Sequence, residues 1–215
     1  MINKRNSKID VIFSAAKELP CFTLDDLASI EKNKTYLKIL FSRYTKVGKV
    51  IRLKKGVYVA KDYLDKIKMN GSLSFYLEMT ANIICQPSYL SLEYVLYQNN
   101  LLTELPVNFT SVALTKTASF SNKFGNFFYH KVKKDLFCGF DIIKEGEFSV
   151  LKASKAKALF DFLYLRKNAI INKESAMALR LNLGEFKKED IKELEKYVKI
   201  EGSKKMKEIF NYFNF

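Results

Sequence analysis

Cations and small hydroxyl groups gather in one short stretch of the chain, where they could bind a phosphate backbone. Residues 32–56 contain nine Lys or Arg residues and no Asp or Glu. Lys and Arg bind phosphate oxygens, and Ser and Thr hydroxyls contact both phosphates and base edges. A charge block of one sign is usually disordered, but this block has apolar residues at helical and then strand spacing. It therefore predicts a folded basic surface, which is typical of nucleic-acid binding.

The first part of this stretch has the pattern of an amphipathic helix. Asn33 is a good N-cap, and Gly48 is a good residue to end the helix. At 100° per residue one side is apolar, with Tyr36, Leu37, Leu40, Phe41, Tyr44 and Val47. The other side carries Thr35, Lys38, Ser42, Thr45 and Lys46. Because small hydroxyls allow close approach, this second side is suited to a DNA major groove.

A short basic hairpin is predicted directly after this helix. Val50–Leu53 and Val57–Val59 are rich in strand formers. Between them, residues 54–56 form a tight turn in which Gly56 can take a positive φ. Cations near the tip would lie along a phosphate backbone. The complete set of predicted DNA-binding residues is Lys34, Thr35, Lys38, Ser42, Thr45, Lys46, Arg52, Lys54 and Lys55.

Two helices are expected before the basic stretch. The first covers 8–19 and stops at Pro20, and the second is a short helix over 24–30 that Thr23 could cap. Three helices followed by a basic hairpin are the arrangement of a winged helix-turn-helix domain, which we place at residues 1–68. The alternative is a small α+β subdomain whose charges are only solvated.

The charge of the chain is concentrated toward its beginning. The 215 residues have a net charge of +14, and residues 1–70 contain 16 basic and 7 acidic residues. A positive excess favours a polyanionic partner. The hydrophobic fraction of 48% is enough to build a core, and no apolar run is long enough to span a membrane. We expect a cytoplasmic protein without a signal peptide.

The remaining residues, 69–215, predict a second and larger domain of mixed α/β structure, so that the expected fold class is α+β. Helices are expected at 72–84 and 92–101, with Ser91 as the cap of the latter. Strands are expected at 109–114 and 127–132, separated by a polar loop. An amphipathic packing helix capped by Ser154 covers 155–165. Two further helices, broken near Gly202, lead to an apolar end that we expect to dock on the core: Phe210, Tyr212, Phe213 and Phe215.

Motifs for catalysis or metal binding are missing from the sequence. Cys21, Cys85 and Cys138 are widely spaced and unpaired, which argues against a disulfide framework and against a zinc site. No nucleotide-binding loop, serine-hydrolase motif or zinc-protease motif occurs. The single histidine, His130, is expected to be an ordinary strand residue. We therefore expect no catalytic residues, no metal and no cofactor.

Several short motifs, in a particular order, resemble AbiEi-type antitoxins. The run 87–114 begins with Tyr89-Leu90-Ser91, which is similar to the family's Tyr-aliphatic-Ser element at a helix start. Residues 153–161 match its pattern of an Ala followed by Lys-Ala-Leu-x-Asp. Residues 51–58 and 127–132 are also similar to family segments. Where the family usually has Gly before Leu101, this chain has Asn100, a residue that tolerates left-handed backbone.

The resemblance implies an antitoxin of a type IV toxin–antitoxin system, with an N-terminal winged helix-turn-helix and a C-terminal antitoxin domain. Its partners would be double-stranded operator DNA with inverted repeats and a cognate nucleotidyltransferase-like toxin. The toxin would be countered without a stable complex, in defence against phage. Two copies would associate on the operator, and the protein would repress its own operon.

Two other functions are compatible with the residues alone. One is a winged-helix transcription regulator that has no toxin partner. The other is a metal-dependent enzyme that processes nucleic acid and uses the basic stretch to hold its substrate. Such an enzyme would need clustered carboxylates, whereas the acidic residues of 71–215 are scattered or stand at expected helix starts.

Overall fold

Two units divide the chain in this computed structural model, which describes residues 7–214 apart from the side chain of Glu185. The first unit contains the residues to Leu77 together with Asn122–Phe124, and the second contains the remainder. Each unit contains both helices and strands, so the fold is mixed α+β as the sequence predicts. The expected domain boundary at residues 68/69 falls near the end of the third α-helix. Residues 1–6 of the expected first domain, and Phe215, lie outside the described residues.

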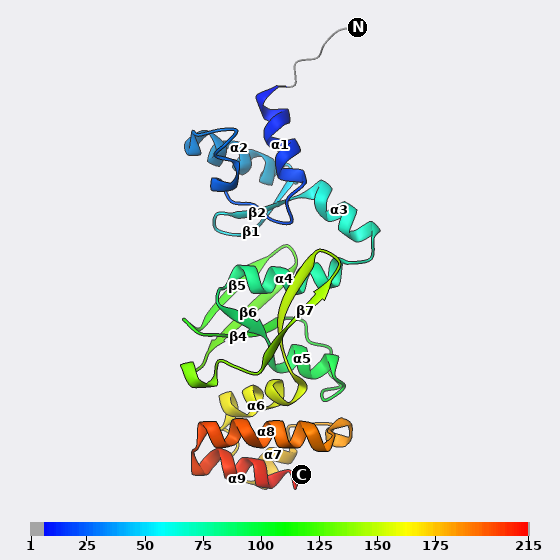
Figure 1. Cartoon of the computed structure of the whole chain (residues 1–215), viewed down its shortest axis with the longest axis vertical. Coiled ribbons are helices and arrows are strands. Elements are labelled where there is room, and N and C mark those ends of the chain that lie inside the picture. The colour runs from blue at the N-terminus through cyan, green and yellow to red at the C-terminus, as the bar shows by residue number, and fades with distance from the viewer. Residues whose placement is uncertain (1–6, 215) are drawn as a thin grey trace. The chain divides into compact units, whose positions relative to one another are not determined.

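The first unit is a small helical body with one hairpin. Its elements, in chain order (Figure 1), are α1 (Lys8–Lys17), η1 (Asp25–Leu27), α2 (Lys34–Lys46), β1 (Val50–Lys54), β2 (Val57–Ala60), α3 (Lys61–Met69) and the start of α4 (Leu73–Ile84). The antiparallel hairpin β1–β2 turns at Lys55-Gly56, and Gly56 has φ +85°, so the predicted turn is confirmed. The α2 helix also begins after Asn33 as predicted.

The prediction of a short helix over 24–30 is wrong, because only the single 3-10 turn η1 forms there. Thr23 does not cap it. Instead, the backbone N–H and the hydroxyl of Thr23 donate to Oδ2 of Asp26, at 2.6 and 2.9 Å. A helix of one or two turns gains too few hydrogen bonds to offset the cost of its first turn. The segment therefore forms a tight turn that buries Leu27.

An aromatic core holds α2 against the hairpin. The rings of Phe22 and Phe41 lie 4.9 Å apart, and the ring of Tyr58 lies 5.9 Å from each of them. Phe22 and Tyr58 also exchange two backbone hydrogen bonds of 2.8 Å. Around these rings, the buried cluster contains Ile12, Ala16, Leu27, Leu37, Leu40 and Val50. Burial of this apolar surface fixes where the polar side of α2 faces.

The second unit is built on a mixed sheet with the strand order β5-β6-β4-β3-β8-β7. Pairs β3–β4 and β7–β8 are antiparallel, whereas β3–β8 and β4–β6 are parallel. The strands are β3 (Ser88–Leu90), β4 (Phe109–Ala113), β5 (Ala118–Asn122), β6 (Gly125–Lys131), β7 (Phe140–Glu145) and β8 (Phe148–Ala153). The helical elements are α5 (Leu92–Gln98), η2 (Lys134–Leu136), α6 (Lys155–Arg166), α7 (Lys173–Met177), η3 (Leu183–Glu185), α8 (Lys188–Glu201) and α9 (Lys204–Tyr212).

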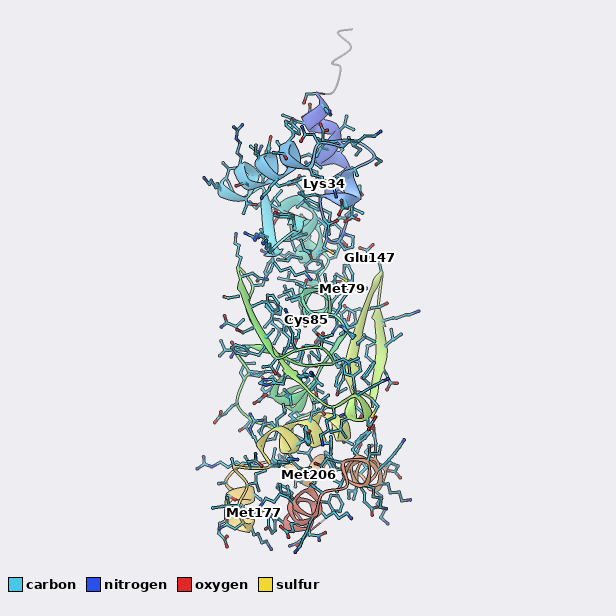
Figure 2. All side chains as sticks on the ribbon, turned by 90° about the vertical axis from the view of Figure 1, so that its left-hand side faces the viewer. Lys34, Met79, Cys85, Glu147, Met177 and Met206 are labelled. Atoms are coloured by element: carbon cyan, nitrogen blue, oxygen red, sulfur yellow. The ribbon has the colours of Figure 1, made fainter. Side chains whose placement is uncertain are left out.

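Helices cover both faces of this sheet (Figure 1). On one face the later part of α4 is bound to the strands, since the Tyr129 hydroxyl donates to the Ala81 carbonyl at 2.6 Å. Asn82 also exchanges two hydrogen bonds with the backbone of Leu151. On the other face lie α5 and α6, with α8 packed on α6 and α9 on α8. Met206, labelled among the C-terminal helices in Figure 2, is fully buried there.

Several predictions for the second unit are confirmed and others are wrong. Ser154 caps α6, the predicted strands 109–114 and 127–132 pair as β4 and β6, and Gly202 separates α8 from α9. The predicted loop between those strands contains β5, and α6 is buried almost all round instead of amphipathic. At the C-terminal end Phe210, Tyr212 and Phe213 are half-buried. Among the described helices, none has both the length and the apolar character needed to cross a bilayer.

Candidate nucleic-acid interface

The α2 helix presents its predicted polar side to solvent. Oδ1 of Asn33 accepts a hydrogen bond from the N–H of Tyr36 at 3.0 Å, which caps the helix. Leu37 and Phe41 are fully buried on the inner side. The outer side exposes the predicted residues Thr35, Lys38, Ser42 and Lys46, whereas Thr45 is half-buried. Val47, expected on the apolar side, is 68% exposed, so that prediction is wrong.

Thr45 has already used the hydrogen of its hydroxyl group. Its Oγ1 donates to the carbonyl of Phe41, one turn earlier, at 2.7 Å. Such a bond from a threonine to the preceding turn is common within helices. The lone pairs of Oγ1 remain, so Thr45 can accept a hydrogen bond from a ligand. Ser42 is exposed one turn before Lys46.

The hairpin carries the other predicted cations. Arg52 and Lys55 are exposed, and Lys54 is half-buried at the end of β1. Nε of Arg52 donates to the backbone carbonyl of Lys54 at 3.3 Å, which orients the guanidinium group beside the turn. Its two terminal nitrogens can then form the parallel pair of hydrogen bonds that suits a phosphate group.

A hollow of about 370 Å³ lies between α2 and the hairpin, and we call it the basic groove. Leu24 and Tyr58 form part of its wall. Six of the nine predicted residues also line it, namely Lys38, Ser42, Thr45, Lys46, Arg52 and Lys55. The structure therefore brings the polar side of α2 and the hairpin cations together at one surface. Within the described part of the first unit, no carboxylate lines this groove.

The other three predicted residues lie outside the groove. Lys34 (Figure 2) forms an exposed ion pair with Asp25, with Nζ and Oδ1 2.5 Å apart. Surface pairs of this kind contribute little to stability, so Lys34 can exchange Asp25 for another anion at small cost. Lys54 is the last residue of β1 and does not line the groove. Thr35 belongs to a neighbouring hollow on α2.

This second hollow, of about 500 Å³, lies on the outer side of α2, and we call it the outer hollow. It is lined by Thr35, Lys38, Ile39, Ser42, Arg43 and Lys46. Ile39 and Arg43 are absent from the predicted set. Their positions on the helical wheel, 40° and 80° from Thr35, could have revealed both. Because Ile39 is apolar, the polar pattern of this side does not reveal it.

Carboxylates near the basic stretch are held by other partners. Glu31, the last acidic residue before it, lies 2.5 Å from Nζ of Lys8 and accepts a hydrogen bond from the N–H of Asn33. These two interactions hold the pKa of Glu31 below its usual value.

Burial raises the pKa of Cys21, Asp26 adds to the rise, and Lys54 opposes it. Cys21 is therefore a neutral thiol beside the hairpin.

A separate polar cluster lies inside the second unit, where Asp161 is completely buried. Its Oδ1 is 2.5 Å from Nζ of Lys157, which is also completely buried. Its Oδ2 accepts hydrogen bonds from the hydroxyls of Tyr89 and Ser91, at 3.0 and 2.8 Å. Burial raises the pKa of Asp161, while Lys157 and the two hydroxyls oppose that rise. We call these four residues the buried network.

The buried network changes the role predicted for Ser91. This residue occupies the N-cap position of α5, but its hydroxyl bonds Asp161 and does not cap the helix. Oγ1 of Thr110 on the neighbouring strand accepts from the N–H of Tyr94 instead, at 3.1 Å. Leu92 follows with φ +61°, a conformation that costs energy for a residue with a side chain. The network and Thr110 hold the chain in this strained turn.

His130 lies on β6 and is half-buried. Burial lowers its pKa and Arg166 lowers it further, whereas Glu93 opposes them. Cys21, Cys85 and Cys138 are free thiols, of which Cys85 is buried. Within residues 7–214, no group of three or more His, Cys, Asp or Glu side chains is arranged to hold a metal ion.

The arrangement thus offers one exposed basic surface in the first unit and one closed polar network in the second. The exposed surface can bind an anion that is extended along α2 and the hairpin. The closed network has its polar groups paired with one another. No protein-family model matches the chain, and a search of curated proteins found no match.

Proposed function

We propose that the chain is a DNA-binding protein whose first unit acts as a winged helix-turn-helix domain. In this proposal α2 enters the major groove, and the β1–β2 hairpin lies along the phosphate backbone. The observation that carries it is the basic groove, where four cations and two small hydroxyl groups meet without a carboxylate in the described lining. The major groove, about 12 Å wide, admits an α-helix.

The two sides of the basic groove would have different tasks. Arg52 and Lys55 would neutralise phosphates, which contributes affinity for every sequence. Ser42 and Thr45 would contact base edges, which contributes specificity. Since the hydroxyl hydrogen of Thr45 is donated to Phe41, Thr45 would accept a hydrogen bond from an amino group of cytosine or adenine.

Substitutions in the two sides of the interface separate these tasks. Replacing Lys54 and Lys55 together by Ala should weaken binding to the operator and to a random duplex by the same factor. Replacing Ser42 by Ala or Thr45 by Val should instead change the ratio of the two affinities. Fluorescence anisotropy with both duplexes measures the two affinities of the unchanged protein and of each variant. If the two kinds of variant behaved alike, the assignment of α2 to the major groove would be wrong.

We further propose that the chain is an antitoxin of the AbiEi type, acting in the cytoplasm. The support is the order of motifs described above and one structural observation about them. Tyr89 and Ser91 come from one motif and Lys157 and Asp161 from another, and all four meet in the buried network. The second unit would counter a nucleotidyltransferase-like toxin without a stable complex, and the first would repress the operon at inverted repeats. Two copies would associate there.

Co-expression with the neighbouring gene tests the antitoxin role. The neighbour alone should arrest growth, and the full chain should restore it. The variant with Lys54 and Lys55 replaced by Ala should still restore growth while it loses repression of a promoter fusion, because the two tasks lie in different units. A harmless neighbour would favour a transcription regulator without a toxin. Cleavage of DNA or RNA that depends on Mg²⁺ and stops with EDTA would favour the enzyme.

A further inference from the structure

Ile39 is an apolar side chain in the middle of the polar side of α2. It is 50% exposed and lines the outer hollow. Thr35 precedes it by one turn and Arg43 follows it by one turn, so its neighbours along this side of the helix are a hydroxyl and a cationic residue. The core of the unit does not use Ile39, since Leu37 and Leu40 on the inner side are buried instead.

We propose that Ile39 recognises a thymine by contacting its C5-methyl group. This inference rests on the proposed function, because it requires α2 in the major groove. On the major-groove edges of the four bases, the thymine methyl is the apolar group, and it is contacted by apolar side chains. An exposed isoleucine on a helix that enters this groove is suited to that contact.

The charge of the outer hollow favours DNA as its occupant. Ile39 is surrounded by Lys38, Arg43 and Lys46, and the described lining of the outer hollow contains no Asp or Glu. An apolar patch of another protein would have to desolvate these three cations without a partner charge, which is costly. A DNA duplex supplies phosphates to the cations and a methyl group to Ile39 at the same time.

Deoxyuridine in place of thymidine removes only this methyl group and so tests the contact. The duplex that binds tightest is first selected from a randomised library, and each thymine in one half-site is then replaced separately. At one position uracil should weaken binding by about fourfold, from ~0.8 kcal/mol per buried CH₂ group and 1.4 kcal/mol per tenfold. With Ile39→Ser, the same uracil should have no effect.

Two further variants complete the test. Ile39→Val keeps two methyl groups at the contact and should retain the sensitivity to uracil. Ile200→Ser, at a 43% exposed position on α8, should behave like the unchanged protein.

The possible failures are distinguishable. If the unchanged protein binds a selected duplex but uracil is neutral at every position, or if that duplex contains no thymine, the role of Ile39 is overturned and DNA binding stands. If Ile39→Ser loses as much affinity with uracil as the unchanged protein does, another residue contacts the methyl group and the inference is also overturned. If no duplex binds, the proposed function fails and this inference fails with it.

Discussion

Lysine has two different roles in this chain, and burial separates them. Lys38 on α2 is exposed at the basic groove, where its charge can bind an anion. Lys157 on α6 is completely buried, bound to Asp161 and close to the rings of Phe160 and Tyr197, at 4.7 and 5.2 Å. Its charge is balanced inside the protein and is closed to ligands. A lysine count therefore overstates the charge that a partner could meet.

Replacement of Asp161 by Ala should destabilise the second unit strongly. The change leaves the Lys157 ammonium buried without its counter-charge, which costs about 3–5 kcal/mol. It also removes the acceptor to which the hydroxyls of Tyr89 and Ser91 donate. Urea denaturation measures the free energy of unfolding. The double change Lys157→Met and Asp161→Leu should recover much of the loss, since both charges are then absent.

The matched control is Glu195→Ala on α8. It breaks an exposed pair in which Glu195 lies 2.8 Å from Lys199, and such pairs contribute about 0–1 kcal/mol. If Asp161→Ala cost no more than Glu195→Ala, the buried network would not stabilise the fold.

At the scale of elements, the α2–hairpin segment was predictable because its signals are local. Asn33 caps the helix, Gly48 follows it with φ +74°, and Gly56 has φ +85° in the turn. The same local rule applies at Asn100, which has φ +60°. AbiEi-type antitoxins, which the sequence resembles, usually have Gly at this position. Each of these positions requires a particular backbone conformation that few residue types adopt at low cost.

Elements that depend on distant partners were not predictable in the same way. Strands β5 and β7 lie at the two edges of the sheet, and most of their side chains are not buried. Their sequences therefore lack the apolar pattern on which strand prediction depends. The prediction that α6 is amphipathic is wrong for the opposite reason. It packs against both α5 and α8, so residues 156–163 are buried on every side and no polar side remains.

For the whole molecule, the sequence predicted the composition of the candidate site better than its geometry. Six of the nine predicted residues meet in the basic groove, because they lie on one side of a helix and on the hairpin that follows it. The buried network joins residues that are 70 and 72 positions apart, and spacing along the chain could not have paired them. Sheet topology brings β3 and α6 together, and topology depends on long-range pairing.

The excess of positive charge in residues 1–70 supports the proposal that the α2–hairpin surface binds DNA through its phosphates. The most direct test is the dependence of affinity on salt. Each phosphate that is neutralised contributes about −0.9 to the slope of log K against log salt. Four contacts from the basic groove predict a slope of roughly −3.6 for the unchanged protein.

Two double variants make this measurement specific to the surface. Replacing Arg52 and Lys55 by Ala should make the slope shallower by about 1.8, as two of the four groove contacts are lost. Replacing Lys188 and Lys192 by Ala removes the same charge from exposed positions on α8 and should leave the slope unchanged. An affinity for DNA that does not depend on salt, or equal slopes for the two double variants, would show that this surface does not bind DNA through its phosphates.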